Sequence, residues 1–162
     1  MSFSRVIDKI SQALFSVAMI GCLLILVVVT MNVFARYIFN SPFHWAEEVT
    51  SITLILVTLF PAAEILKKGM HIKFELIKQK LPENIWAFLE VVINFLSMVF
   101  TSVLTWQTLM ATRLVYLRNM KEPSLLGTPM WVPYGFMLIG IAVLFLMFLI
   151  AFFGSVRKLV GR

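Results

Sequence analysis

The stretch RYIFNSPFHWAEEVTSITLILVTLFPAAEILKKGMHIKFELIKQKLP, residues 36–82, decides the fold. Its centre, from Trp45 to Leu66, is about 22 mostly apolar residues, enough to cross a hydrocarbon core about 30 Å thick. Glu47 and Glu48 stand near the start of this segment. The pattern therefore predicts a membrane-spanning helix with two acids near its N-terminal end.

The two ends of this helix carry different signals. Ser41 followed by Pro42 predicts the helix start, because the serine can accept from a free backbone N–H and the proline needs no donor. The other end is basic, through Lys67 and Lys68. Arg36 precedes the helix and has two open interpretations: it pairs with one of the two glutamates, or it reaches lipid phosphate.

Working outward, the same reading predicts three more spans and two surface helices. The other uncharged or nearly uncharged segments cover about 13–35, 85–110 and 131–153. Apolar residues recur at helical spacing in about 2–12 and 70–81, which favours amphipathic helices lying on the membrane surface. The lysines expected to reach lipid phosphates there are Lys67, Lys68, Lys73, Lys78 and Lys80.

Composition independently indicates an integral membrane protein. The chain has 162 residues, of which 60% are hydrophobic and 14% charged, whereas a soluble domain carries roughly a quarter charged residues. The net charge of +6 does not indicate nucleic-acid binding, because the bases stand at helix ends and in connections. A single cysteine, Cys22, offers neither a disulfide nor a cysteine-based metal site, and we expect no cofactor.

The distribution of basic residues predicts the orientation. The two termini and the 67–84 connection carry ten Lys and Arg, against four in the other two connections, Arg36, Arg113, Arg118 and Lys121. The positive-inside rule therefore places both termini in the cytoplasm. The expected fold is an all-α membrane protein with four transmembrane helices and short interfacial amphipathic helices.

Polar residues line one face of the third span. They are spaced by three or four residues, as one helix face requires: Glu90, Asn94, Ser97, Thr101, Thr105 and Thr108. The face can line a water-filled path or hydrogen-bond to a neighbouring helix, and we favour the second because hydroxyls can bond their own backbone. Glu90 needs a partner or a water-reachable end.

Enzyme chemistry is not indicated. The two histidines, His44 and His71, stand at predicted helix ends, and the sequence has no paired cysteines or phosphate-binding glycine loop. Two classes of non-enzyme remain. One is an accessory subunit, and the other is a small multidrug-type exporter coupled to protons through Glu64 or Glu90, which lie near helix ends rather than at mid-membrane.

Four short motifs, in order around one apolar helix, resemble the small membrane subunit of TRAP (tripartite ATP-independent periplasmic) transporters, the DctQ-like family. The motifs are R-Y-x-x-N, W-x-E-E, G-x-H-I and L-P, carried by Arg36, Tyr37, Asn40, Trp45, Glu47, Glu48, Gly69, His71, Ile72, Leu81 and Pro82. One departure is that Phe74, followed by Glu75, stands where an acid is common in the family.

The resemblance implies a scaffold in the bacterial inner membrane. Such subunits pair with a large DctM-like elevator-type subunit, which takes up an organic acid with sodium after a periplasmic DctP-like binding protein delivers it. We expect the bracing residues to be Arg36, Trp45, Glu47, Glu48, Glu90 and Asn94. Residues expected on the periplasmic side, as a docking surface, are Asn40, Phe43, His44, Arg113, Arg118 and Lys121.

Overall fold

The part of the chain that the structure describes folds into four long α-helices. The computed structural model describes residues 3–67, 82–123 and 126–160. Its helices are α1 (Phe3–Phe39), α2 (Trp45–Lys67), α4 (Glu83–Leu117) and α5 (Trp131–Val160). Each contains a segment long and apolar enough to cross a membrane, of 31, 22, 33 and 27 residues in chain order. The all-α class and the four long apolar helices agree with the sequence analysis.

The helices run further than the apolar segments predict. α1 is continuous from Phe3, with no break between the surface segment 2–12 and the span that follows. α4 continues past residue 110 to Leu117, and α5 continues past residue 153 to Val160. A charged residue marks where a helix leaves the hydrocarbon, but its backbone hydrogen bonds continue beyond that depth. The predicted surface helix 70–81 lies outside the described residues.

The start of α2 corrects one prediction. Ser41 and Pro42 do not begin the helix, which starts at Trp45. The Ser41 backbone N–H instead donates to the carbonyl of Ala35 at 3.3 Å, so this residue closes the end of α1. Asn40, between the two helices, has φ 50°, a left-handed conformation that asparagine tolerates better than most residues.

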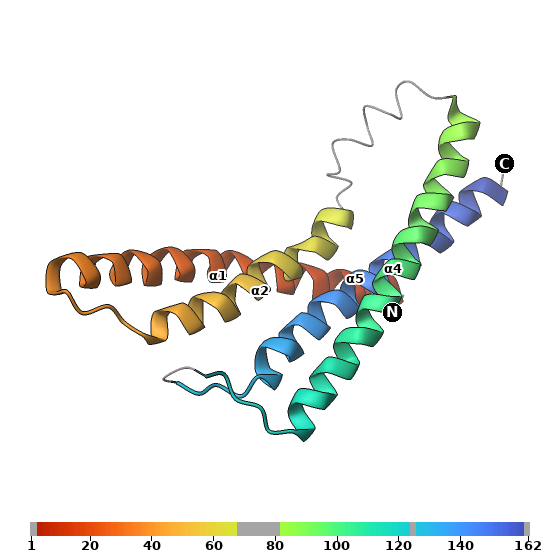
Figure 1. The fold of residues 1–162 in the computed structure, drawn as a ribbon. Coiled ribbons are helices and arrows are strands. Elements are labelled where there is room, and N and C mark those ends of the chain that lie inside the picture. Colours follow the sequence, from red (N-terminus) through yellow and green to blue (C-terminus); the bar gives the residue numbers. More distant parts are fainter. Residues whose placement is uncertain (1–2, 68–81, 124–125, 161–162) are drawn as a thin grey trace.

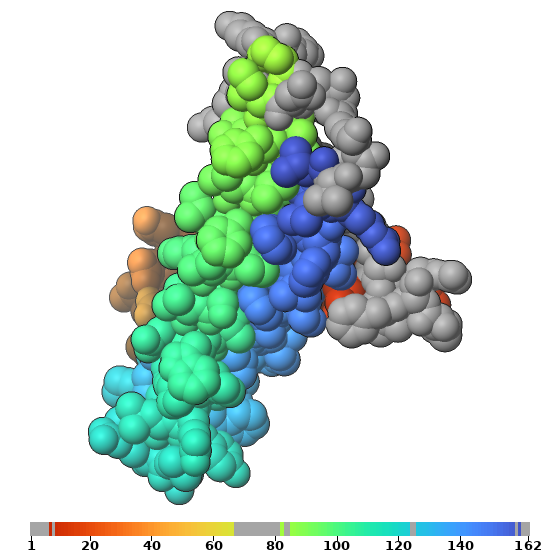
Figure 2. Space-filling model, turned by 90° about the vertical axis from the view of Figure 1, so that its right-hand side faces the viewer, coloured from red at the N-terminus to blue at the C-terminus, as the bar shows by residue number. Residues whose placement is uncertain are grey.

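The helices form two antiparallel pairs that cross each other (Figure 1). α1 lies along α2, α4 lies along α5, and α2 joins the pairs by packing on α5. Figure 2 shows α4 and α5 side by side along one face of the molecule. The core is a small apolar cluster at the crossing, where Ile7 of α1 and Ala63 of α2 meet Val143 and Met147 of α5.

Glycines permit the closest helix approaches. A Cβ added at Gly140 of α5 would lie 2.8 Å from Cβ of Leu59 in α2, closer than real Cβ atoms come. A Cβ at Gly21 of α1 would meet methyl groups of Thr53 and Val57 at 3.1 and 3.2 Å. α2 is therefore held against α5 and α1 at positions that take no side chain.

Candidate functional site

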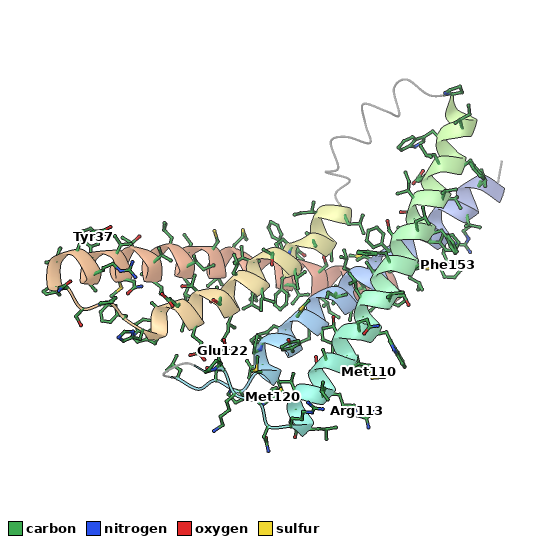
Figure 3. The ribbon with its side chains drawn as sticks, in the orientation of Figure 1. Tyr37, Met110, Arg113, Met120, Glu122 and Phe153 are labelled. Carbon is green, nitrogen blue, oxygen red and sulfur yellow. The ribbon has the colours of Figure 1, made fainter. Side chains whose placement is uncertain are left out.

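The connections 40–44 and 118–130 lie at the same end of the molecule. Glu48, in the first turns of α2, is 8% exposed, and its Oε1 accepts from the backbone N–H of Thr128 at 3.1 Å. Figure 3 places Glu122 of the second connection close to the first turns of α2. One buried carboxylate therefore ties the second helix pair to the first, and we call this region the loop end.

The described residues of the 118–130 connection are held by several backbone hydrogen bonds, despite its glycine and prolines. Asn119, two residues beyond the end of α4, has φ 47°, and the N–H of Met120 donates to the carbonyl of Val115 at 3.2 Å, as in a Schellman cap. The N–H of Glu122 donates to the carbonyl of Thr128 at 3.0 Å, and that of Met130 to Met120 at 3.0 Å. These bonds make a short hairpin-like loop, and they present the Thr128 N–H to Glu48.

The 40–44 connection is held by an asparagine that the sequence analysis passed over. Asn32 lies within the first apolar helix, and its Oδ1 accepts from the backbone N–H of Phe43 at 2.7 Å. The ring of Phe43 in turn packs on that of Trp45, with centroids 5.6 Å apart. An amide in an otherwise apolar helix, four residues before Arg36, is the signal that identifies this position.

A cavity of about 410 Å³ opens between the last turns of α1 and the first turns of α2. Its lining residues are Val29, Asn32, Val33, Arg36, Ala46, Glu47, Thr50 and Ser51. Within the described part of the chain, Arg36 forms no ion pair with Glu47 or Glu48. The two unlike charges of Arg36 and Glu47 border the same space instead, and we call this cavity the α1–α2 cleft.

A second cavity, of about 420 Å³, lies between α2 and the 118–130 loop. It is acidic, because its lining includes Glu47, Glu48 and Glu122, and His44 also borders it. The bases of the loop end, Arg113, Arg118 and Lys121, have exposed side chains, and Figure 3 shows Arg113 near the end of α4. The loop end therefore combines an acidic cavity with exposed bases.

The polar face of α4 turns toward α5. Asn94 Nδ2 donates to Ser155 Oγ at 2.8 Å, and Ser155 Oγ lies 3.3 Å from Glu90 Oε1 and 3.0 Å from the carbonyl of Ala151. Thr101 and Thr108 are buried, and the Thr101 hydroxyl donates to the carbonyl of Ser97. These contacts support the helix-packing interpretation of the polar face.

The other embedded acid is also in a helix contact. Glu64 of α2 is 5% exposed, and its Oε2 accepts from the hydroxyl of fully buried Ser11 of α1 at 3.0 Å. Ser11, like Ser155, lies where a predicted span meets the membrane surface, and a single serine there gives no distinctive sequence signal. The two acids proposed for proton exchange, Glu64 and Glu90, thus both touch serines of neighbouring helices.

The remaining predicted residues are placed as follows. Asn40, Phe43, His44 and Trp45 are exposed at the loop end. Lys67 ends α2, and the other predicted lipid-facing lysines, Lys68, Lys73, Lys78 and Lys80, lie outside the described residues. No cluster of three metal-binding side chains is found among the residues that the structure describes.

Comparison with known families gives one match across most of the chain. Residues 25–158 match the family described as "Tripartite ATP-independent periplasmic transporters, DctQ component". The match begins within α1 and ends near the end of α5, so it includes both connections of the loop end and the α1–α2 cleft. No curated protein matches the chain.

Proposed function

This chain belongs to the DctQ-component family of the TRAP transporters, and on that premise we propose that it braces the large membrane subunit during sodium-driven uptake of an organic acid. The family is a transporter component and not an enzyme. Membership implies a tripartite complex with a DctM-type membrane subunit and a periplasmic DctP-type protein. The observation that carries the proposal is the family match over residues 25–158, from within α1 to near the end of α5.

The internal contacts agree with a bracing role. The embedded acids Glu64 and Glu90 contact serines of neighbouring helices, so they serve helix packing in this arrangement. Both described cavities lie at the loop end, where helices leave the apolar segments. A transporter that works alone needs a substrate site reached in turn from both sides of the membrane, typically near the bilayer midplane.

The outer helix faces suit burial by lipid or by a larger membrane partner. Large apolar side chains are exposed along α1 and α4, among them Ile20, Leu23, Phe34, Phe88 and Phe100. Inside a membrane such apolar faces can contact lipid tails directly and need not be buried within the protein. On our proposal the large subunit packs against part of this surface, and the periplasmic protein docks at the loop end.

Reconstitution tests the proposal. The large membrane subunit is first identified by co-purification with this chain. The two proteins are then co-expressed and placed in liposomes. The periplasmic protein and labelled organic acids are added outside. Uptake should require all three proteins and an inward sodium gradient, and it should stop when choline replaces sodium. Uptake by the isolated chain, driven by a proton gradient, would contradict the bracing role and favour a small proton-coupled exporter.

A further inference from the structure

The α1–α2 cleft has opposite charges on its two walls. Arg36 comes from the last turn of α1, and Glu47 from the first turn of α2. They border one cavity of about 410 Å³ without forming an ion pair with each other. This volume is within the range of small-molecule sites, about 300–1,000 Å³. A ligand that carries one charge of each sign would complement both walls.

The hydroxyls on the acidic wall strengthen this complementarity. Thr50 Oγ1 donates to the carbonyl of Ala46 at 2.6 Å, and Ser51 Oγ donates to the carbonyl of Glu47 at 2.8 Å. Each hydroxyl has a single hydrogen, so both offer the cleft lone pairs only. The α2 wall therefore accepts hydrogen bonds, which suits a ligand ammonium group. The Arg36 guanidinium on the α1 wall donates only, and its fork fits a phosphate.

The depth of the cleft identifies the source of such a ligand. Val33 and Val29 line it about one and two turns before Arg36, further into the apolar part of α1. The charged residues thus stand where a membrane helix meets lipid head groups, and the valines face the depth of the upper acyl chains. A soluble zwitterion would have no use for that apolar wall.

We propose that the α1–α2 cleft binds a zwitterionic phospholipid with a primary ammonium, of the phosphatidylethanolamine class. Arg36 binds the lipid phosphate, Glu47 with the hydroxyls of Thr50 and Ser51 binds the ammonium, and Val29 and Val33 contact the glycerol and upper acyl region. Lipid binding at this site requires neither a particular orientation of the chain nor transport activity. It can therefore be tested independently of the bracing role.

Native mass spectrometry of the purified full-length chain tests the site. The protein is exposed to equal amounts of phosphatidylethanolamine, phosphatidylglycerol and phosphatidylcholine. All three carry a phosphate, but only phosphatidylethanolamine has an ammonium group with N–H donors. The unmodified protein should retain phosphatidylethanolamine preferentially. Arg36→Gln should lower retention of all three lipids, by about tenfold for phosphatidylethanolamine, as expected for one charge-assisted contact. Glu47→Gln should remove the preference over phosphatidylglycerol.

Two further variants separate binding from folding. Val33→Phe fills the apolar wall without changing any charge, and it should also lower lipid retention. Arg113→Gln removes a base from the loop end outside the cleft, and its retention should equal that of the unmodified protein. All four variants should melt within a few degrees of the unmodified protein, because the four substituted side chains are exposed.

Two results would overturn the proposal. One is equal retention of the three lipids by the unmodified protein, with Arg36→Gln and Arg113→Gln indistinguishable. The other is full displacement of the lipid by an equal concentration of free phosphoethanolamine, which would identify a soluble zwitterion as the ligand. If free phosphoethanolamine competes only at large excess, the acyl region contributes to binding, as the valine wall requires.

Discussion

The close contact between α2 and α5 depends on the absence of a Cβ atom at Gly140. A Cβ there would lie 2.8 Å from Leu59 Cβ, an atom next to the α2 backbone that cannot rotate away. Gly135, on the same helix, has nothing within 4 Å of such an atom. Alanine favours a helix over glycine by about 1 kcal/mol, and overpacking costs about 1–3 kcal/mol. We therefore expect Gly140→Ala to lower the unfolding free energy and Gly135→Ala to leave it unchanged or raise it.

Thermal or denaturant unfolding in one detergent measures both variants. Equal stability of Gly140→Ala and Gly135→Ala would mean that α2 and α5 do not approach as closely as described.

Ser155 is a second residue whose effect is local and measurable. Its hydroxyl accepts from Asn94 and has a single hydrogen to give to Glu90 or Ala151. A double-mutant cycle of Asn94→Ala and Ser155→Ala should give a coupling of about 0.6 kcal/mol, the average for hydrogen bonds between membrane helices, and no more than about 1.7 kcal/mol. The control cycle pairs Asn94→Ala with Ser16→Ala, since the Ser16 hydroxyl bonds its own helix. Coupling no larger than in the control would exclude the contact.

At the scale of elements, Glu48 attaches the 118–130 loop to α2 through its hydrogen bond with the Thr128 N–H. Glu48→Leu leaves the part-buried Thr128 N–H without its carboxylate acceptor, and a hydrogen bond to a charged group is worth about 1.5–3 kcal/mol. Hydrogen exchange in the loop should therefore accelerate by about tenfold or more. Glu47→Leu, one residue earlier and exposed, should leave exchange in the loop unchanged. The contact is refuted if both leucine variants exchange alike.

Sequence could predict the helices but not how they pair. Long apolar segments dictate their own structure, because a membrane-embedded backbone has no other way to satisfy its polar groups. The α4 face was predictable too, since Asn94 and the threonines recur at helical spacing. The partners Ser11, Ser155 and Thr128 lie 53, 61 and 80 residues from Glu64, Asn94 and Glu48, and no local pattern encodes such distances.

The candidate site shows the same division. Arg36, Glu47 and Glu48 were identified as a group, because charges beside apolar helices are conspicuous. Their arrangement was not, since Glu48 turns to Thr128 while Arg36 and Glu47 line a cleft. A residue spacing along the chain brings charges to one membrane face but does not determine which side of a helix each occupies.

At the scale of the whole molecule, the two connections of the loop end should lie on the side opposite the C-terminus. Four spans and the excess of bases at the termini predict a periplasmic loop end. Cys22 is the single cysteine, so Cys22→Ser gives a background for labelling. Met120→Cys should react with an impermeant maleimide in intact cells, and Arg157→Cys only after lysis. Labelling of both positions under the same condition would refute this topology.

Docking of the periplasmic protein should depend on the exposed bases of the loop end. Reversing Arg118 and Lys121 to glutamate leaves the acidic cavity without its basic surroundings, which should slow encounter with an acidic partner and reduce its salt dependence. Uptake should fall several-fold at low concentrations of the periplasmic protein and recover at high ones. Reversal of Arg157, on the opposite end, is the matched control. Uptake equal to that control at every concentration would exclude the loop end as the docking surface.

The distance along the chain between Glu48 and Thr128 has a consequence for biosynthesis. Translation at about 5–20 residues per second needs on the order of 4–16 s to make the 80 residues between them. All four residues of the Ser11–Glu64 and Asn32–Phe43 contacts are translated before any residue of α5. Until then the α2 surface that meets Gly140 has no α5 to pack on, although α4 is made within the same interval. The contact between α2 and α5 can therefore form only after the chain has been translated past Gly140.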